Sequence, residues 1–179
     1  MLGVVDALFG LGPFGFRGPA AEHIPNHLTF CDGGVRTARL IAPGYACPSN
    51  DFLARSVEAC DDDLLYITSA NRSRHLTGAD DSPAHWRAQG LHSEFGHEPD
   101  FMVLEHGDEL AARNRYPDHL PMSTTVLGFH RLGPDRRRPQ LVVERHGSLH
   151  VDVVREVLDR LGFGLVLGPL AQRRLSQRT

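Results

Sequence analysis

The chain has 179 residues, of which 41% are hydrophobic and 23% are charged, so its composition is that of a globular protein rather than a disordered or fibrous one. This length favours a single domain with a buried core. The formal net charge of −3 gives the chain no overall attraction to nucleic acid or acidic membranes. All 19 basic residues are arginine, which excludes a Schiff-base lysine, a Walker A lysine and a lysine general base.

The cysteines and the amino-terminal segment bear on the cellular compartment. Cys31, Cys47 and Cys60 are odd in number and widely spaced, which argues against a disulfide framework and against a thiolate zinc site. The apolar opening contains Asp6 and has no basic segment, so we expect no signal peptide, and no apolar run is long enough to span a bilayer. We therefore expect a cytoplasmic protein.

Short apolar runs bounded by Gly, Pro or Asp predict the strands, which are 37–42, 64–68, 101–105, 124–129, 140–144 and 164–168. The run 64–68 shows little alternation, which predicts a strand buried on both faces.

Helices are expected between these strands. One is predicted over 50–60 with Ser49 as its cap, and another over 83–89, where Ser82 and Pro83 give a cap-then-proline signal. The strongest is 151–161, which ends at Gly162 and carries one apolar stripe of Val151, Val154, Leu158 and Leu161. The alternation of strands and helices predicts an α/β fold, a twisted mixed sheet with flanking helices.

Polar residues at the ends of these strands are the candidate binding residues. Thr68, Ser69 and Asn71 follow the run 64–68, and ligands of α/β sheets bind beyond the carboxyl ends of strands. An ordinary strand-to-loop turn explains the same residues. Ser123 opens the strand at 124–129, and Arg145 closes the one at 140–144, where a guanidinium can hold a phosphate or carboxylate.

In chain order, the sequences TSANRS (68–73), STTV (123–126) and VVERHGSL (142–149) resemble the YrdC/Sua5 family, as does GLGPFGF (10–16). The family pattern is TSAN-x-S, then Ser-Thr-Val, then a strand ending in Arg-x-Gly before a final helix. The resemblance covers about residues 10–162 and implies a YrdC-like domain over 1–165 followed by a basic tail over 166–179. The family's amino-terminal third, with its Lys-x-Arg-Pro segment, has no counterpart in the sequence. Arg39 is a displaced candidate for the family's arginine before TSAN.

The resemblance implies synthesis of L-threonylcarbamoyladenylate from ATP, L-threonine and bicarbonate, which supplies the threonylcarbamoyl group for tRNA modification. It implies that Ser69, Asn71 and Arg145 bind the nucleotide, that Thr68 and Ser123 lie near the threonine, and that Mg²⁺ bridges phosphate oxygens. A non-catalytic module of the same fold that binds a nucleotide or double-stranded RNA is the alternative.

The carboxy-terminal part is basic. Residues 131–179 hold ten arginines against five acidic residues, and the run Arg136, Arg137 and Arg138 is a candidate RNA contact. A solvated loop explains the same run.

Two further patterns are set aside. Gly10, Gly12 and Gly15 match G-x-G-x-x-G, but a dinucleotide site needs a strand before and a helix after these glycines, and Pro19 interrupts the segment after them. The histidine-rich and acidic segment 92–106 lacks metal-ligand spacing, so we expect no metal site.

Overall fold

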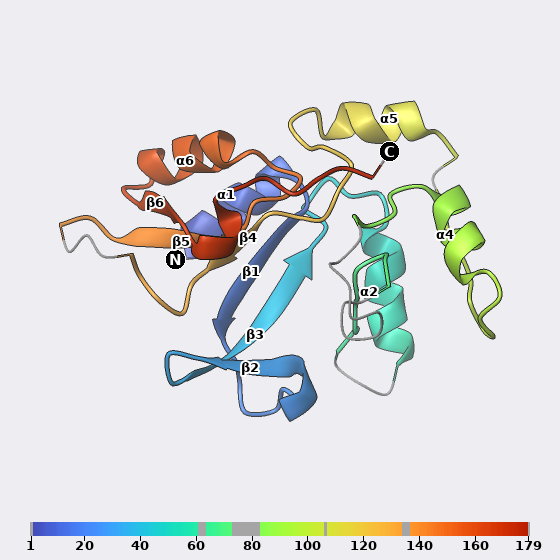
Figure 1. The fold of residues 1–179 in the computed structure, drawn as a ribbon, viewed down its shortest axis with the longest axis horizontal. Coiled ribbons are helices and arrows are strands. Elements are labelled where there is room, and N and C mark those ends of the chain that lie inside the picture. The colour runs from blue at the N-terminus through green and yellow to red at the C-terminus, as the bar shows by residue number, and fades with distance from the viewer. Residues whose placement is uncertain (1, 61–63, 73–82, 106, 134–136, 179) are drawn as a thin grey trace.

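The computed structural model describes residues 2–60, 64–72, 83–105, 107–133 and 137–178. It contains a six-stranded sheet with the strand order β2-β3-β1-β4-β5-β6 (Figure 1). The β1–β4 and β5–β6 pairs are parallel and the other neighbours are antiparallel. The strands are β1 (Phe14–Pro19), β2 (Thr29–Asp32), β3 (Val35–Ala42), β4 (Val126–Gly128), β5 (Gln140–Arg145) and β6 (Gly164–Leu167). The prediction of an α/β mixed sheet with flanking helices is confirmed.

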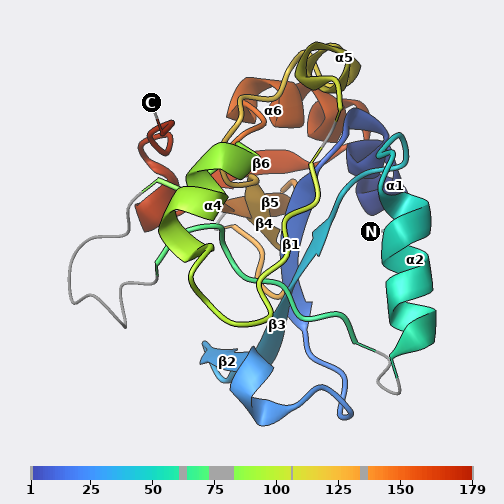
Figure 2. The same cartoon turned by 90° about the vertical axis from the view of Figure 1, so that its right-hand side faces the viewer.

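The helices differ in how far they contribute to the core. They are α1 (Leu2–Leu11), α2 (Asn50–Ala59), α4 (Ala88–Phe95), α5 (Glu109–Arg115) and α6 (Val151–Arg160), with single 3₁₀ turns at Asn26–Leu28 and Pro169–Ala171. Helices α1 and α6 bury apolar residues, whereas α2, α4 and α5 bury none. In Figure 1 the latter three lie at the side of the molecule away from β6, and this side faces the viewer in Figure 2.

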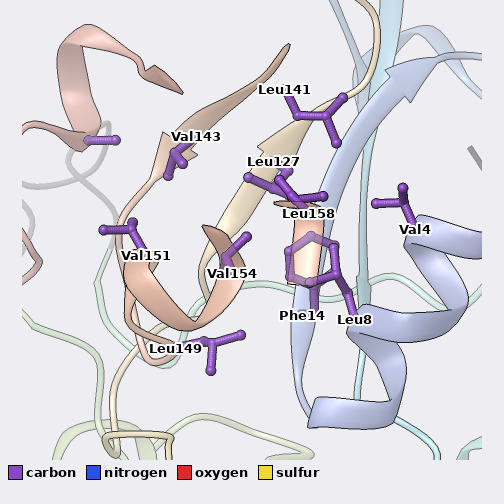
Figure 3. Packing of buried hydrophobic residues seen from close by; sticks show 11 residues of the cluster. Val4, Leu8, Phe14, Leu127, Leu141, Val143, Leu149, Val151, Val154 and Leu158 are labelled. Atoms are coloured by element: carbon purple, nitrogen blue, oxygen red, sulfur yellow. The ribbon is translucent and has the colours of Figure 1, made fainter. Parts of the chain in front are cut away.

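The hydrophobic core lies between one face of the sheet and the pair α1 and α6 (Figure 3). Helix α1 supplies Val4 and Leu8, and α6 supplies Val154 and Leu158. The sheet contributes the buried side chains of Phe14, Leu127, Leu141 and Val143. The apolar stripe of α6 and the apolar alternation of the strands therefore meet in one core.

Strand alternation sends the other side chains to the opposite face of the sheet. In β1, Phe14 and Phe16 point into the core, so Gly15 and Arg17 point away from it. Arg17 is paired with Arg39 of β3, and Asp32 of β2 is paired with Val35 of β3, so these side chains share that second face. We call it the polar face, and it carries Arg17, Asp32, Arg39, His130, Glu144 and Arg145.

Two of the predicted strands are wrong. Residues 64–68 and 101–105 have no regular structure, and the first run is not buried, since Ile67 is 59% exposed. The centre of the sheet is occupied by β1, between β3 and β4, and neither run joins the six strands that the structure describes. An apolar run becomes a buried strand only where it pairs with another strand.

The helix predictions had mixed outcomes. The helix at 50–60 is α2, but the Ser49 hydroxyl does not cap it and lies 3.0 Å from the Cys47 sulfur. The helix at 83–89 is wrong, because α4 begins at Ala88; Ser82 lies outside the described residues.

The helix at 151–161 is confirmed as α6. Leu161 is the exception in its predicted stripe, since it follows the last helical residue and is 41% exposed. Gly162 adopts a φ of 80°, the left-handed conformation that ends helices.

The amino-terminal elements were not predicted. Gly10 lies in α1, Gly15 lies in β1 and Gly12 lies between them, so the glycine segment leads from a helix into a strand. This order is the reverse of the one a dinucleotide-binding turn requires, and the rejection of that motif is confirmed.

The core interpretation predicts a difference between two leucines of the same segment. Leu158→Ala should lower the free energy of unfolding by about 2–5 kcal/mol, because Leu158 is fully buried between α6 and the sheet. Leu161→Ala should cost less than about 1 kcal/mol, because its side chain is largely in solvent. Urea denaturation followed by circular dichroism measures both, and equal losses would contradict the placement of α6.

Candidate functional site

Arg145 stands at the end of β5 and is held by the segment that precedes β4. Its Nε donates to the Thr124 carbonyl oxygen at 2.7 Å and its Nη2 to the Thr124 hydroxyl at 2.9 Å. The backbone N–H of Ser148 donates to the Ser123 carbonyl at 2.8 Å. The structure thus brings together two of the segments singled out in the sequence, 123–126 and 142–149.

Gly147 explains why this junction needs the Arg-x-Gly sequence. A Cβ at this position would lie 2.1 Å from the Ser123 carbonyl oxygen and 2.6 Å from that of Thr124. Any side chain would therefore push the two segments apart. The buried Thr125 hydroxyl completes the junction by donating to the Leu149 carbonyl at 2.6 Å and accepting from the Gly147 N–H.

The charge of Arg145 is in an unfavourable environment. Burial lowers the pKa of its guanidinium to about 10, and the positive charge of Arg39 adds to the effect. Among the described residues, neither Arg145 nor Arg39 forms an ion pair with a carboxylate, and Nη1 of Arg145 makes no hydrogen bond. The negative charge of Glu144 compensates part of the charge of Arg39, whereas burial and Arg39 both disfavour the charge of Arg145. An anion beside Arg145 would therefore be stabilised.

A second polar group lies beside these two arginines. His130 Nε2 is 2.8 Å from Asp32 Oδ2 and 3.8 Å from Glu144 Oε1. Arg17 Nε is 3.2 Å from Glu144 Oε2, and its Nη1 is 3.8 Å from Asp32 Oδ2. The hydrogen bond with His130 lowers the pKa of Asp32, with the nearby Arg131 as a further cause.

An irregularity in β5 brings Glu144 and Arg145 to the same face. The register shifts between Val126 and Leu127, which pair with Arg145 and Val143, so Glu144 is an extra residue without an opposite partner. A bulge of this kind changes the direction of the side chains on the longer strand. Glu144 can therefore face Arg17 while Arg145 faces Arg39.

Sequence reasoning missed the group of Asp32, His130 and Glu144. His130 is separated in sequence from Asp32 by 98 residues, too far for any local metal-ligand spacing to join them. The turn at Asp32-Gly33-Gly34, between two runs with strand composition, is a hairpin signal that would have found β2 and β3. The carboxylate of Glu144, which follows three apolar residues of β5, is the other sequence feature that points to this group.

Thr68, Ser69 and Asn71 lie in an irregular segment, with Thr68 and Ser69 exposed. The Ala70 carbonyl accepts a hydrogen bond from the His85 N–H at 2.7 Å, which places this segment beside the residues that lead into α4. This contact joins the segment 68–71 to the region of α4. The contacts of Ser123 and Arg145 instead join the segment before β4 to the end of β5, so these two predicted site residues are brought together by different elements from Thr68, Ser69 and Asn71.

An ion-pair network centred on Glu94 of α4 lies beside that segment and includes Arg72, which follows Asn71. Glu94 Oε2 is 2.5 Å from His85 Nε2 and 3.2 Å from Arg178 Nη2, and its Oε1 is 3.7 Å from Arg72 Nε. The hydrogen bond from His85 lowers the pKa of Glu94. Arg178 also donates to the Pro83 carbonyl at 3.0 Å, so the carboxy-terminal segment is attached to α4.

The arginine run is only partly described. Arg136 lies outside the described residues, and Arg137 is exposed. Arg138 donates to Asp159 Oδ1 at 2.7 Å and to the carbonyls of Gly162 and Phe163. Its guanidinium therefore holds the loop between α6 and β6 together.

Across the part of the chain that the structure describes, Asp32, His130 and Glu144 are the one group of His, Cys, Asp or Glu residues arranged closely enough to hold a metal ion. Their ligand atoms lie within 4.8 Å of one another. The group lies on the polar face, away in sequence from the histidine-rich segment 92–106.

No protein-family model, curated protein or solved structure matches this chain. Among the described residues, no helix has the length and hydrophobicity needed to cross a membrane. Function is therefore inferred from the polar face itself.

The buried His146, next to Arg145, predicts a loss of stability in mild acid. Burial lowers the pKa of His146, and the charges of His150 and Arg174 lower it further. Because the folded state then binds fewer protons than the unfolded state, stability should fall as the pH drops through about 6.5 and below. His146→Gln should reduce that loss, and His97→Gln, at an exposed position, should not. Urea denaturation at pH 7.5 and 5.5 tests this, and equal slopes for all three proteins would contradict it.

Proposed function

We propose that this chain binds the phosphate groups of a nucleotide at Arg145 and Arg39, and that its activity is related to the synthesis of L-threonylcarbamoyladenylate. The observation that carries the proposal is the half-buried Arg145 guanidinium, which Thr124 holds in place and which has no carboxylate partner among the described residues, while the positive charge of Arg39 acts on it. Keeping Arg145 charged in that environment costs free energy, and a phosphate would offset the cost.

The residues around Arg145 suit an anionic ligand. Two of its N–H groups are held by Thr124, which fixes the guanidinium plane and leaves Nη1 for a phosphate oxygen. Arg39 lies on β3, which β1 and β4 separate from β5, but its positive charge still acts on Arg145. It is exposed, so it can approach the same anion from the solvent side. Mg²⁺ would accompany the nucleotide, bound through its phosphate oxygens.

The proposed chemistry needs positioned cations more than a nucleophile of the protein. Transfer of an adenylyl group from ATP releases pyrophosphate, and the negative charge that develops on this leaving group is stabilised by arginines. The assignment of Ser69 and Asn71 to the nucleotide, and of Thr68 and Ser123 to L-threonine, is part of the same proposal and rests on the sequence resemblance.

The site has fewer cations than the family pattern. The sequence contains no lysine, so the Lys-x-Arg-Pro contribution to the phosphates is missing. This observation favours, as the second candidate, a module that binds the nucleotide without turning it over. A cytoplasmic location also belongs to the proposal, supported by three free cysteines.

Isothermal titration calorimetry with ATP tests the binding site. Arg39→Gln should weaken binding about tenfold without affecting folding, because its exposed guanidinium contributes charge and makes no hydrogen bond among the described residues. Arg145→Lys should weaken it at least as much, because an ammonium group lacks the fork geometry. Arg55→Gln removes the same charge from α2, and its affinity for ATP should stay that of the unmodified protein. Equal affinities for all four proteins would refute the assignment.

Turnover is a separate measurement. Release of pyrophosphate from ATP that requires both L-threonine and bicarbonate would support a synthase. Binding of ATP without such release would identify the non-catalytic module. Absence of both, with folded protein, would end the proposal.

A further inference from the structure

We propose that Asp32, His130 and Glu144 bind one divalent transition-metal ion on the polar face. Their ligand atoms lie within 4.8 Å of one another, so a single ion can reach all three after small side-chain movements. The proposal concerns different side chains from the nucleotide site and stands or falls independently of it.

Unpartnered buried atoms point to a missing ligand. The side chain of Glu144 is 8% exposed, and neither of its oxygens accepts a hydrogen bond among the described residues. Oε2 forms an ion pair with Arg17 Nε at 3.2 Å, which leaves Oε1 as the buried oxygen open to a ligand. The side chain of His130 is 1% exposed, and its Nε2 faces both carboxylates. Polar atoms buried in this way cost free energy unless something coordinates them.

The backbone around the group is shaped to leave room for it. A Cβ on Gly128 would lie 2.9 Å from Glu144 Oε1 and 3.3 Å from His130 Cε1, so a side chain there would collide with two of the proposed ligands. Asp32 ends β2, Glu144 lies in β5, and His130 follows β4 by two residues. Ligands carried on, or just after, strands of one sheet are held in position before an ion arrives.

The ligand set selects the class of ion. One imidazole nitrogen with two carboxylates suits Mn²⁺, Fe²⁺, Co²⁺ or Zn²⁺, whereas Mg²⁺ and Ca²⁺ prefer oxygen ligands throughout.

Arg17 is the group with which an ion would compete. Its guanidinium lies near Glu144 and Asp32, so it supplies their counter-charge. Its Cζ is also 5.6 Å from the centre of the Phe30 ring, a second place for the charge when an ion takes the carboxylates.

Titration with Co²⁺ in the absence of nucleotide, followed by visible absorption and competition with Zn²⁺, tests the site in the untagged full chain. The unmodified protein should bind one ion. Glu144→Gln and Asp32→Asn should each weaken binding at least tenfold. Glu98→Gln removes an exposed acid beside a histidine and should leave Co²⁺ binding unchanged.

Arg17→Gln distinguishes a metal site from an ion-pair cluster that serves only the fold. Removal of the competing cation should tighten Co²⁺ binding, whereas a purely structural cluster predicts no specific binding to begin with. Failure of the folded protein to bind Co²⁺, or equal binding by the Glu144→Gln and Glu98→Gln proteins, would overturn the proposal. Asp32 is less buried than Glu144, so Asp32→Asn carries the test if Glu144→Gln fails to fold.

Discussion

The pairing of β4 with β5 is the constraint on which the rest of the polar face depends. The register shift opposite Val126 and Leu127 makes Glu144 the extra residue of β5. Without it, strict alternation would place Glu144 and Arg145 on opposite faces, and one of the two charges would enter the core between the sheet and α6. The junction of Gly147 with the Ser123 carbonyl fixes the end of the same pair, since no larger residue fits there.

The elements that were predictable are those whose sequence pattern and packing agree. Helix α6 shows this, because Val151, Val154 and Leu158 lie on one helical face and that face meets the sheet. Thr68 to Asn71, Ser123 and Arg145 were predicted to share one site, and the structure joins the segments of the last two. The first segment contacts His85, before α4. The apolar runs at 64–68 and 101–105 had the composition of strands but join none of the six described strands, and composition alone contains no information about a partner strand.

The group of Asp32, His130 and Glu144 shows the opposite limit. Each residue has an ordinary local explanation. Asp32 lies at a hairpin turn, His130 follows the end of β4, and Glu144 lies near the end of β5. Their proximity results from the strand order, in which β1 separates β3 and β2 from β4 and β5 and Arg17 of β1 lies between the charges. Strand order depends on long-range pairing, which no local pattern in one sequence specifies.

Arg39 links the two parts of the polar face. The charges of Arg17 and Glu144 both act on it, and its own charge acts on Arg145. A metal ion that neutralised Glu144 would leave the positive charge of Arg39 less compensated. The attraction between Arg39 and an anion bound at Arg145 would then be stronger. Because the groups share a partly dehydrated surface, such effects are weakened less by solvent than they would be between fully exposed side chains. The chemistry of this face is therefore set by a cluster of interacting charges on β1, β3 and β5 rather than by one side chain.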